Sequence, residues 1–503
     1  MVRGHSGSGP RNTEHEPPVL SLTEEYRSSS PETPLLLVET PQSHFGHPGK
    51  NLLPLLHNVK MRYSTSPTLL PPLSTTLSAA LTSSFSSTYN QIYAVEDDIY
   101  QFPDDNNLYA GPPPYIPLCA SQWLPDDFVH CIHAFAPFQY LLDKLKIPEI
   151  ISETVPSHRY LREAVLVLAS VHRNGDKFDP AVEDGEHYHS LCSSLLDRRS
   201  YTVDDALTAL LIVWSFFGVG GPWQKWLQVT YIYADSVLLD PRHPGPADAL
   251  MKCDEKMAFV IKTALWFDVL ASVTTQEPPH FLHPIRLMFS PSCSGIHDLS
   301  DPQLSMMKLT GCENHIIWAL AETSYLLAWK QTQIRRRCLR LGDLLEIAAD
   351  IQASLLRQPM AEPYHHDIDY CRHVTSEIFR SSARVYLLSV LLGDYPFVPE
   401  TRESVEDTLR CIQLVPNVSS AVLRQTALRS TVFSIFICGC LTDDACHRKV
   451  LLDHLDRETG ECVGRLSRIR QLLERVWETR AMNDKLSSVR WLEVLKEQQI
   501  VLV

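Results

Sequence analysis

Glycine is scarce in this chain, with 19 glycines among 503 residues, or about 4% against a usual share of about 7%. Folds built from many tight turns use glycine heavily, so its scarcity favours helices joined by short loops. Convincing alternation of apolar and polar residues, the mark of half-buried strands, is also missing. Both absences predict an all-helical protein.

Cysteine is absent from the first 118 residues. The 13 cysteines begin at Cys119, their spacings are irregular, and no C-x2-C pair occurs anywhere. This pattern does not suit a disulfide framework. We therefore expect reduced, buried thiols in an intracellular protein.

Long apolar runs are lacking too. The first 18 residues contain no apolar core, so we expect no secretory signal. No run of 18 or more apolar residues exists, and the richest stretch, 206–217, is too short to span a bilayer. The net charge of -14 argues against binding of a nucleic-acid phosphate backbone by this chain alone. The sequence predicts neither membrane insertion nor direct nucleic-acid contact.

The first 115 residues differ in composition from the rest. They hold 15 of the 35 prolines, and 64–90 is a Ser/Thr-dominated tract. Such a composition buries too little apolar surface to offset the entropy of ordering, so 1–115 is predicted to be disordered. Within it, 96–109 (EDDIYQFPDDNNLY) interleaves acids with aromatic and aliphatic residues. That pattern is typical of some activation segments. We favour the alternative, a solvated linker that docks its aromatics on the folded domain, because such short patterns are common by chance.

From residue 116 onward, apolar residues recur at three- and four-residue steps. The predicted helices are 160–171, 187–196, 204–217, 223–239, 339–357, 374–392, 401–414, 421–439 and 465–480. The predicted fold is all-α, a large array of stacked antiparallel helix pairs over 116–503, behind the disordered N-terminal region.

The segment 263–330 is the most informative part of the chain. Two apolar, helix-like stretches flank the pair Pro278 and Pro279, and the first must end before them because a residue preceding proline avoids the helical region. Asp268 is the polar exception in the middle of the first stretch. We interpret it as a hydrogen-bonded buried carboxylate or a tie between helices, in preference to a ligand contact.

Eight apolar stretches follow one another along the chain. They are LREAVLVLASVH (161–172), DDALTALLIVWSFF (204–217), WQKWLQVTYIYAD (223–235), WFDVLASVTTQEPPHF (266–281), GCENHIIWALAETSYLLAWK (311–330), RVYLLSVLLGDYP (384–396), ALRSTVFSIFICGC (427–440) and LLERVWETR (472–480). In this order they resemble the fungal-specific transcription factor domain of zinc-cluster (Zn2Cys6) regulators, over about 118–496. The resemblance implies a regulatory domain that is not an enzyme. It implies a location in the nucleus, and we expect the cytoplasm if that implication fails. It also implies response to a small-molecule effector and homo- or heterodimers with other regulators.

One part of that family pattern is missing. The zinc cluster needs six closely spaced cysteines beginning C-x2-C to supply four ligands to each ion, and this chain has none before Cys119. The resemblance therefore carries over no DNA-binding residues and no cofactor. Two alternatives stay open: an upstream exon is missing from the gene model, or the chain is a clusterless adaptor that acts through other regulators.

Two groups of side chains could supply ligands to a metal ion. His365, Asp369 and His373 have the spacing of one helix face, and two histidines with a carboxylate can hold a non-heme metal. A helical metal-dependent enzyme using these three residues is the alternative function, although a polar loop entering a helix is the favoured interpretation. Cys438, Cys440, Cys446 and His447 are interpreted as ordinary packing, since structural zinc sites rarely lack a C-x2–4-C pair. No metal ligands are assigned.

Two further clusters carry binding hypotheses. Trp214, Trp223, Trp226 and Trp266 are candidates for an apolar effector pocket, with core packing as the favoured alternative. The basic run of Arg335, Arg336, Arg337 and Arg340 could serve nuclear import or an acidic partner, with a solvated helix end favoured.

Overall fold

The computed structural model describes residues 146–174, 185–217, 220–291, 301–356, 366–457, 466–482 and 490–502. The region predicted to be disordered, 1–115, lies outside these residues, as does the acidic segment within it. Throughout the described part of the chain, every regular element is a helix. The all-α class predicted from composition and periodicity is confirmed.

The first half of the described chain forms eight helices. They are α5 (Lys146–Thr154), α6 (Arg159–Asn174), α8 (Gly185–Leu195), α9 (Val203–Ser215), α10 (Trp223–Leu238), α11 (Pro246–Met251), α12 (Glu255–Thr275) and α13 (Leu282–Phe289). The start of α9 shows why the prediction succeeded there. Thr202 and Asp205 form a capping box, with each side chain accepting from the other residue's backbone N–H.

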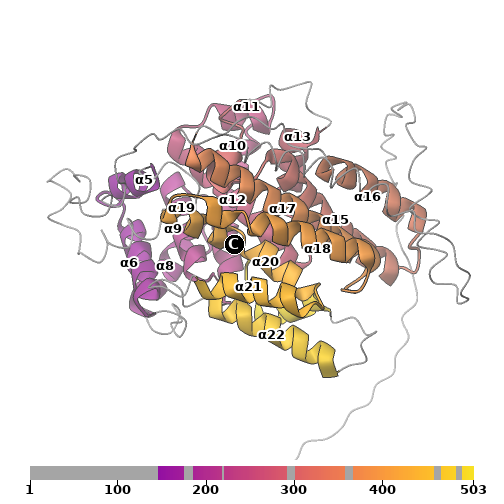
Figure 1. The fold of residues 1–503 in the computed structure, drawn as a ribbon. Coiled ribbons are helices and arrows are strands. Elements are labelled where there is room, and N and C mark those ends of the chain that lie inside the picture. The colour runs from indigo at the N-terminus through magenta and orange to yellow at the C-terminus, as the bar shows by residue number, and fades with distance from the viewer. Residues whose placement is uncertain are drawn as a thin grey trace, which may run out of the picture. The chain divides into compact units, whose positions relative to one another are not determined.

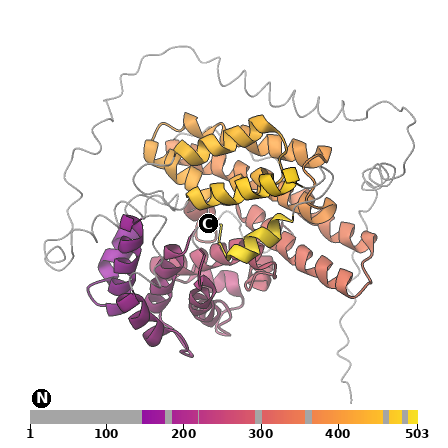
Figure 2. The same ribbon diagram turned by 90° about the horizontal axis from the view of Figure 1, so that it is seen from below.

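The second half continues the same pattern. Its helices are α14 (Met307–Thr310), α15 (Asn314–Arg335), α16 (Leu341–Leu355), α17 (Asp367–Leu392), α18 (Pro399–Ile412), the 3-10 turn η5 (Val415–Asn417), α19 (Ala421–Ser430), α20 (Val432–Cys440), α21 (Ala445–Arg457), α22 (Leu466–Met482) and α23 (Trp491–Gln498). Helices adjacent in sequence pack as pairs, notably α9 with α10, α15 with α16 and α17 with α18 (Figure 1). Seen from below, the purple helices lie at the lower left and most of the orange and yellow helices lie at the top, while one short yellow helix lies near the centre (Figure 2).

Two predicted helices differ from those observed. The stretch 421–439 is not one helix, because it breaks at Thr431 into α19 and α20. The Thr431 hydroxyl donates to the carbonyl of Ala427 at 2.9 Å, a back-bond that bends helices. The helix predicted at 374–392 begins earlier, at Asp367, whose carboxylate accepts from the backbone N–H groups of Ser419 and Ser420. Its first two turns mix acids, Arg372 and His373 with Ile368, Tyr370 and Cys371, so the apolar spacing there was masked by polar residues.

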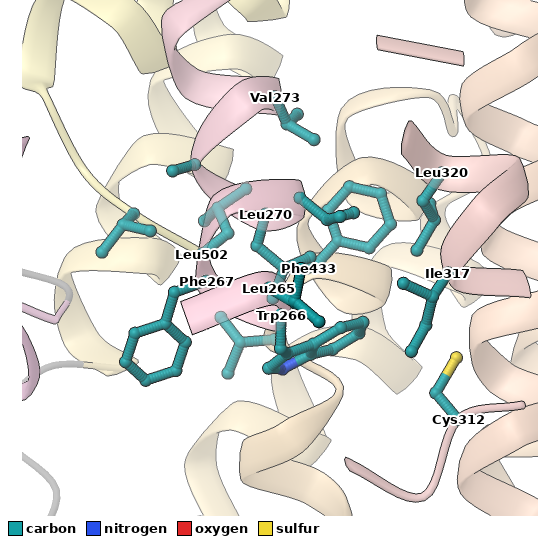
Figure 3. Close-up of a cluster of buried hydrophobic side chains, with 14 of the residues drawn as sticks. Leu265, Trp266, Phe267, Leu270, Val273, Cys312, Ile317, Leu320, Phe433 and Leu502 are labelled. Carbon is teal, nitrogen blue, oxygen red and sulfur yellow. The ribbon is translucent and has the colours of Figure 1, made fainter. Parts of the chain in front are cut away.

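Helix α12 is buried on almost every side. It contacts α9, α10, α15 and α23, and Leu265, Trp266, Phe267 and Leu270 reach outward from it to different neighbours (Figure 3). By length and composition it is apolar enough to cross a membrane, an exception to the expectation that no segment is long enough, but 83% of that window is buried inside the protein. Its apolarity is accounted for by its place in the core.

The segment after α22 completes that core. Trp491, Ile500 and Leu502 are 0–1% exposed. The Trp223 indole donates to the carbonyl of Gln499, and the Thr274 hydroxyl donates to that of Ile500, both at 2.6 Å. Residues 490–502 therefore bind to helices more than 200 positions earlier in the chain. We call this stretch the C-terminal segment.

Gly439 allows α20 and α22 to approach closely. A Cβ at this position would lie 2.6 Å from Cδ2 of Leu473. We expect Gly439→Val to lower the free energy of unfolding by about 1–3 kcal/mol through overpacking. Gly342, at the start of α16, is the matched control, since nothing lies within 4 Å of a Cβ there. Urea denaturation should show no loss for Gly342→Ala, and equal midpoints for the two variants would contradict the close packing.

Candidate functional site

Asp268 is the centre of the main polar site. Its side chain is 3% exposed in the middle of α12. It accepts three hydrogen bonds, from the Tyr231 hydroxyl at 2.9 Å and from the backbone N–H groups of His280 at 3.0 Å and Phe281 at 2.8 Å. This confirms the interpretation of Asp268 as a buried carboxylate whose partners tie α12 to α10 and to the connection into α13.

The prolines explain why the carboxylate is needed. Helix α12 ends at Gln276, which adopts a left-handed conformation with φ 61°. Pro278 and Pro279 have no backbone N–H to donate. The next two N–H groups, those of His280 and Phe281, both donate to Asp268. A single acceptor thus satisfies two successive backbone donors of this turn, of which the Phe281 N–H is buried and would otherwise be left unpaired.

The network continues from Asp268 to the surface. The His280 ring stacks on the Tyr231 ring, with centroids 4.6 Å apart and planes 3° from parallel. Its Nε2 lies 2.8 Å from Oδ2 of Asp235 on α10. The side chains of His280 and Asp235 are about one-third exposed. The site is therefore closed at Asp268 and open to solvent at His280.

Burial controls the electrostatics of this site. Removal from water raises the pKa of Asp268 to about 6, even though three hydrogen bonds favour its charged form. Burial and the neighbouring carboxylate raise the pKa of Tyr231 well above its usual value. The arrangement accepts hydrogen bonds and fixes a turn, which is a structural role.

The raised pKa predicts a pH dependence. Between the usual value of 3.8 and about 6, the folded protein holds a proton that the unfolded chain has released. Stability contributed by this group therefore falls as pH rises through that window. We expect wild type to lose stability from pH 4 to 6 relative to Asp268→Asn, measured by urea denaturation at each pH.

Asp205 supplies a control, because its pKa is shifted in the opposite direction to that of Asp268. Burial alone would raise the pKa of Asp205, but hydrogen bonds from His158 and Thr202 together lower it to about 2. Its contribution is present above 3.8 and is lost as pH falls toward 2. The difference between wild type and Asp205→Asn should stay flat from pH 4 to 6. A flat profile for Asp268→Asn as well would contradict the raised pKa.

A second buried carboxylate ties α13 to α15. Glu322 is 6% exposed and pairs with Arg286 through two hydrogen bonds of 2.6 and 2.8 Å. The same guanidinium lies 4.6 Å from the centroid of Tyr325. Sequence analysis missed Tyr231, Arg286 and Glu322. The available signal was a lone charge inside an apolar stretch, as with Glu322 in WALAETSYLLAW.

The four candidate tryptophans are all buried, at 0–5% exposure. Trp223 and Trp226 on α10 donate their indole N–H groups to Gln499 and to Tyr188. Trp214 packs edge-on against Phe267, whereas Trp266 packs against Phe379 on α17. These contacts are those of core side chains, as in the favoured interpretation. An effector pocket lined by these rings stays a prediction.

The structure describes most, but not all, of the residues in the two candidate metal sites. His365 lies outside the described residues. Asp369 is exposed and pairs with Arg372, while burial lowers the pKa of His373. Cys438 and Cys440 are buried in α20, and Cys446 is exposed on α21. Within the described ranges no three His, Cys, Asp or Glu side chains are grouped to hold a metal, and the site built on His365 stays untested.

The basic run occupies the turn between α15 and α16. Arg335, Arg336, Arg337 and Arg340 are all exposed there. Arg337 adopts a positive φ of 55°. The favoured expectation of a solvated helix end thus matches its position.

Family comparison agrees with this architecture. The model of the fungal specific transcription factor domain matches residues 133–503, a range that includes every described helix. The chain belongs to this family. The resemblance stated from the eight apolar stretches is confirmed. The residues of the Asp268 network, from Tyr231 to Phe281, lie well inside the matched range.

Several curated relatives are transcription factors. The chain is 29% identical over 119 residues to the ustiloxin B cluster transcription factor of Aspergillus flavus, covering 22% of this chain and 20% of that one. It is 22% identical over 246 residues to a transcription factor of a Nectria species, covering 44% and 37%. It is 25% identical over 203 residues to a trichothecene biosynthesis transcription regulator of Trichoderma arundinaceum, covering 39% and 44%. The matches span less than half of each relative. No solved structure matches the chain.

Proposed function

We propose that this chain is a regulator of transcription that acts in the nucleus through its helical domain and is not an enzyme. The family match over 133–503 carries the proposal. The names of the relatives support it, since each is described as a transcription factor or regulator. No DNA contact is assigned to these 503 residues, because they contain no C-x2-C pair.

The proposed mechanism is a shift between helical arrangements. A small molecule or a partner regulator that binds one arrangement better than another changes its population. Polar ties between the central helices include Asp268 with its donors, Glu322 with Arg286, and the hydroxyl contacts of Ser324 with Ser272 and Tyr386. Ligand binding that strengthens or breaks one of these ties would alter the surface offered to a homo- or heterodimer partner.

A tethering experiment tests the function. The full chain is fused to an unrelated DNA-binding domain and placed upstream of a reporter gene in a fungal host, and its location is followed with a fluorescent tag. We expect nuclear accumulation and reporter output that differs from the DNA-binding domain alone. Unchanged output, together with exclusion from the nucleus, would refute the proposal. Co-purification of other regulators from nuclear extract would favour the adaptor form of it.

The alternative, a metal-dependent enzyme using His365, Asp369 and His373, has its own test. Metal content of the purified full chain is compared with that of a His365→Ala, His373→Ala double variant. Stoichiometric metal that is lost in the double variant would favour the enzyme.

A further inference from the structure

The turn between α15 and α16 forms a compact basic surface. Four arginines lie within six residues, and all are exposed: Arg335, Arg336, Arg337 and Arg340. Two large apolar side chains flank them, Ile334 at 53% and Leu341 at 57% exposure. We call these six residues the arginine tip.

The charges of the arginine tip are not neutralised within the described part of the chain. Arg335 donates only to the Thr332 hydroxyl, at 3.2 Å, and no ion pair involves the other three arginines. Elsewhere in the domain, guanidinium groups such as Arg286 and Arg380 hold buried carboxylates. Four like charges in such a short turn repel one another, so an anionic partner there would relieve the repulsion.

The N-terminal region contains a segment of complementary chemistry. Between 96 and 109 there are five acids and no base: Glu96, Asp97, Asp98, Asp104 and Asp105. Ile99, Tyr100, Phe102, Leu108 and Tyr109 are interleaved with them. The whole stretch 63–129 contains no Lys, Arg or His. Its carboxylates suit guanidinium groups, and its apolar side chains suit the two exposed aliphatic residues of the tip.

We propose that residues 96–109 dock on the arginine tip of the same chain. The 36 residues of 110–145 separate this segment from α5. Fully extended they reach about 120 Å, whereas a domain of this size has a radius of gyration of about 20 Å. The segment can therefore reach any face of the helical domain. Each exposed ion pair contributes at most about 1 kcal/mol, but tethering supplies an effective concentration on the order of millimolar.

An acidic segment fits this surface better than a nucleic acid does. The net charge of the whole chain is -14, so its long-range field repels a phosphate backbone. Asp343, Glu346 and Asp350 are exposed along α16 and confine the positive surface to the tip. A short peptide can contact the arginine tip alone, whereas the phosphates of a longer nucleic acid would also be repelled by these carboxylates on α16. The proposed contact is a property of the chain itself and does not depend on the proposed function.

A binding experiment tests the contact in the folded full chain. The acids of its own 96–109 segment are changed to the matching amides to free the tip, and a fluorescent peptide of the natural 96–109 sequence is titrated in. Changing the four tip arginines to Gln should weaken binding at least tenfold. The control changes Arg162, Arg199, Arg242 and Arg402 to Gln, the same loss of charge at exposed positions elsewhere. Circular dichroism checks that both variants remain folded.

Four outcomes would overturn the proposal. The tip variant could bind the peptide as well as the control does, both variants could lose affinity equally, or an oligonucleotide could bind the tip and displace the peptide. Insensitivity of peptide binding to salt would also contradict it, since exposed ion pairs are screened.

Cross-linking tests the contact within one chain. Arg335→Lys, Arg336→Lys, Arg337→Lys and Arg340→Lys keep the charge and provide amines that a zero-length carbodiimide joins to carboxylates. We expect mass spectrometry to find links from these positions to Glu96, Asp97, Asp98, Asp104 or Asp105, at a yield that does not change on dilution. Links only to acids elsewhere, or a yield proportional to concentration, would refute docking within the chain.

Discussion

Trp491→Ala is expected to lower the free energy of unfolding by about 3–5 kcal/mol, the usual cost of deleting a large buried aromatic side chain. The indole is 0% exposed. It packs edge-on against Tyr386 on α17 and Phe436 on α20, with centroids 6.2 and 6.1 Å away. No nearby side chain can fill a cavity of this size without leaving its own contacts. Urea denaturation monitored by circular dichroism measures the loss.

The effect should spread beyond α23. Trp491 positions a segment whose later residues accept hydrogen bonds from Trp223 and Thr274. Gly220 shows how close this contact is, since a Cβ there would lie 2.4 Å from the carbonyl oxygen of Gln498. Hydrogen exchange should therefore increase in α10 and at the end of α12 as well as in the C-terminal segment.

Lys496→Ala is the matched control for this prediction, because Lys496 lies on the same short helix and is exposed. It should change stability by less than about 0.5 kcal/mol. If Trp491→Ala cost no more than Lys496→Ala, the C-terminal segment would not be part of the cooperative core.

Local sequence patterns predicted most helices closely. The stretch 204–217 was predicted as a helix and α9 spans Val203–Ser215, because its cap and its apolar run are both local. The break at Thr431 was missed because apolar residues continue across it. Periodicity reports the burial of a stretch and carries no signal for a local break inside a continuous apolar run.

The polar ties were much harder to predict. Asp268 could be singled out as a lone carboxylate in an apolar helix, but its donor Tyr231 lies 37 positions away. Glu322 and Arg286 lie 36 positions apart. The hydrogen bonds between the C-terminal segment and Trp223, Thr274 and Gln276 span 216–276 positions. Such pairs are set by the packing of helices, and one sequence carries no periodic signal for them.

Asp268→Ala is the second variant with a large expected effect. It removes the acceptor for two backbone N–H groups, those of His280 and Phe281. The Phe281 N–H is buried and the His280 N–H is partly buried. A buried donor left without a partner costs about 1–3 kcal/mol and the loss of a typical hydrogen bond about 1 kcal/mol, so we expect a loss of roughly 2–4 kcal/mol in the free energy of unfolding, measured by urea denaturation at pH 7. The prolines before His280 prevent this turn from becoming helical to satisfy the same groups.

Two companion variants separate the causes of that loss. Tyr231→Phe removes one hydroxyl donor and keeps the ring that stacks on His280, so it should cost about 1 kcal/mol. Asp350→Ala removes an exposed carboxylate from α16 and should cost almost nothing. A loss for Asp268→Ala no larger than that for Tyr231→Phe would mean that water or another acceptor satisfies the turn. The connection into α13 would then hold without its carboxylate, fixed to α10 by the stacked rings of His280 and Tyr231.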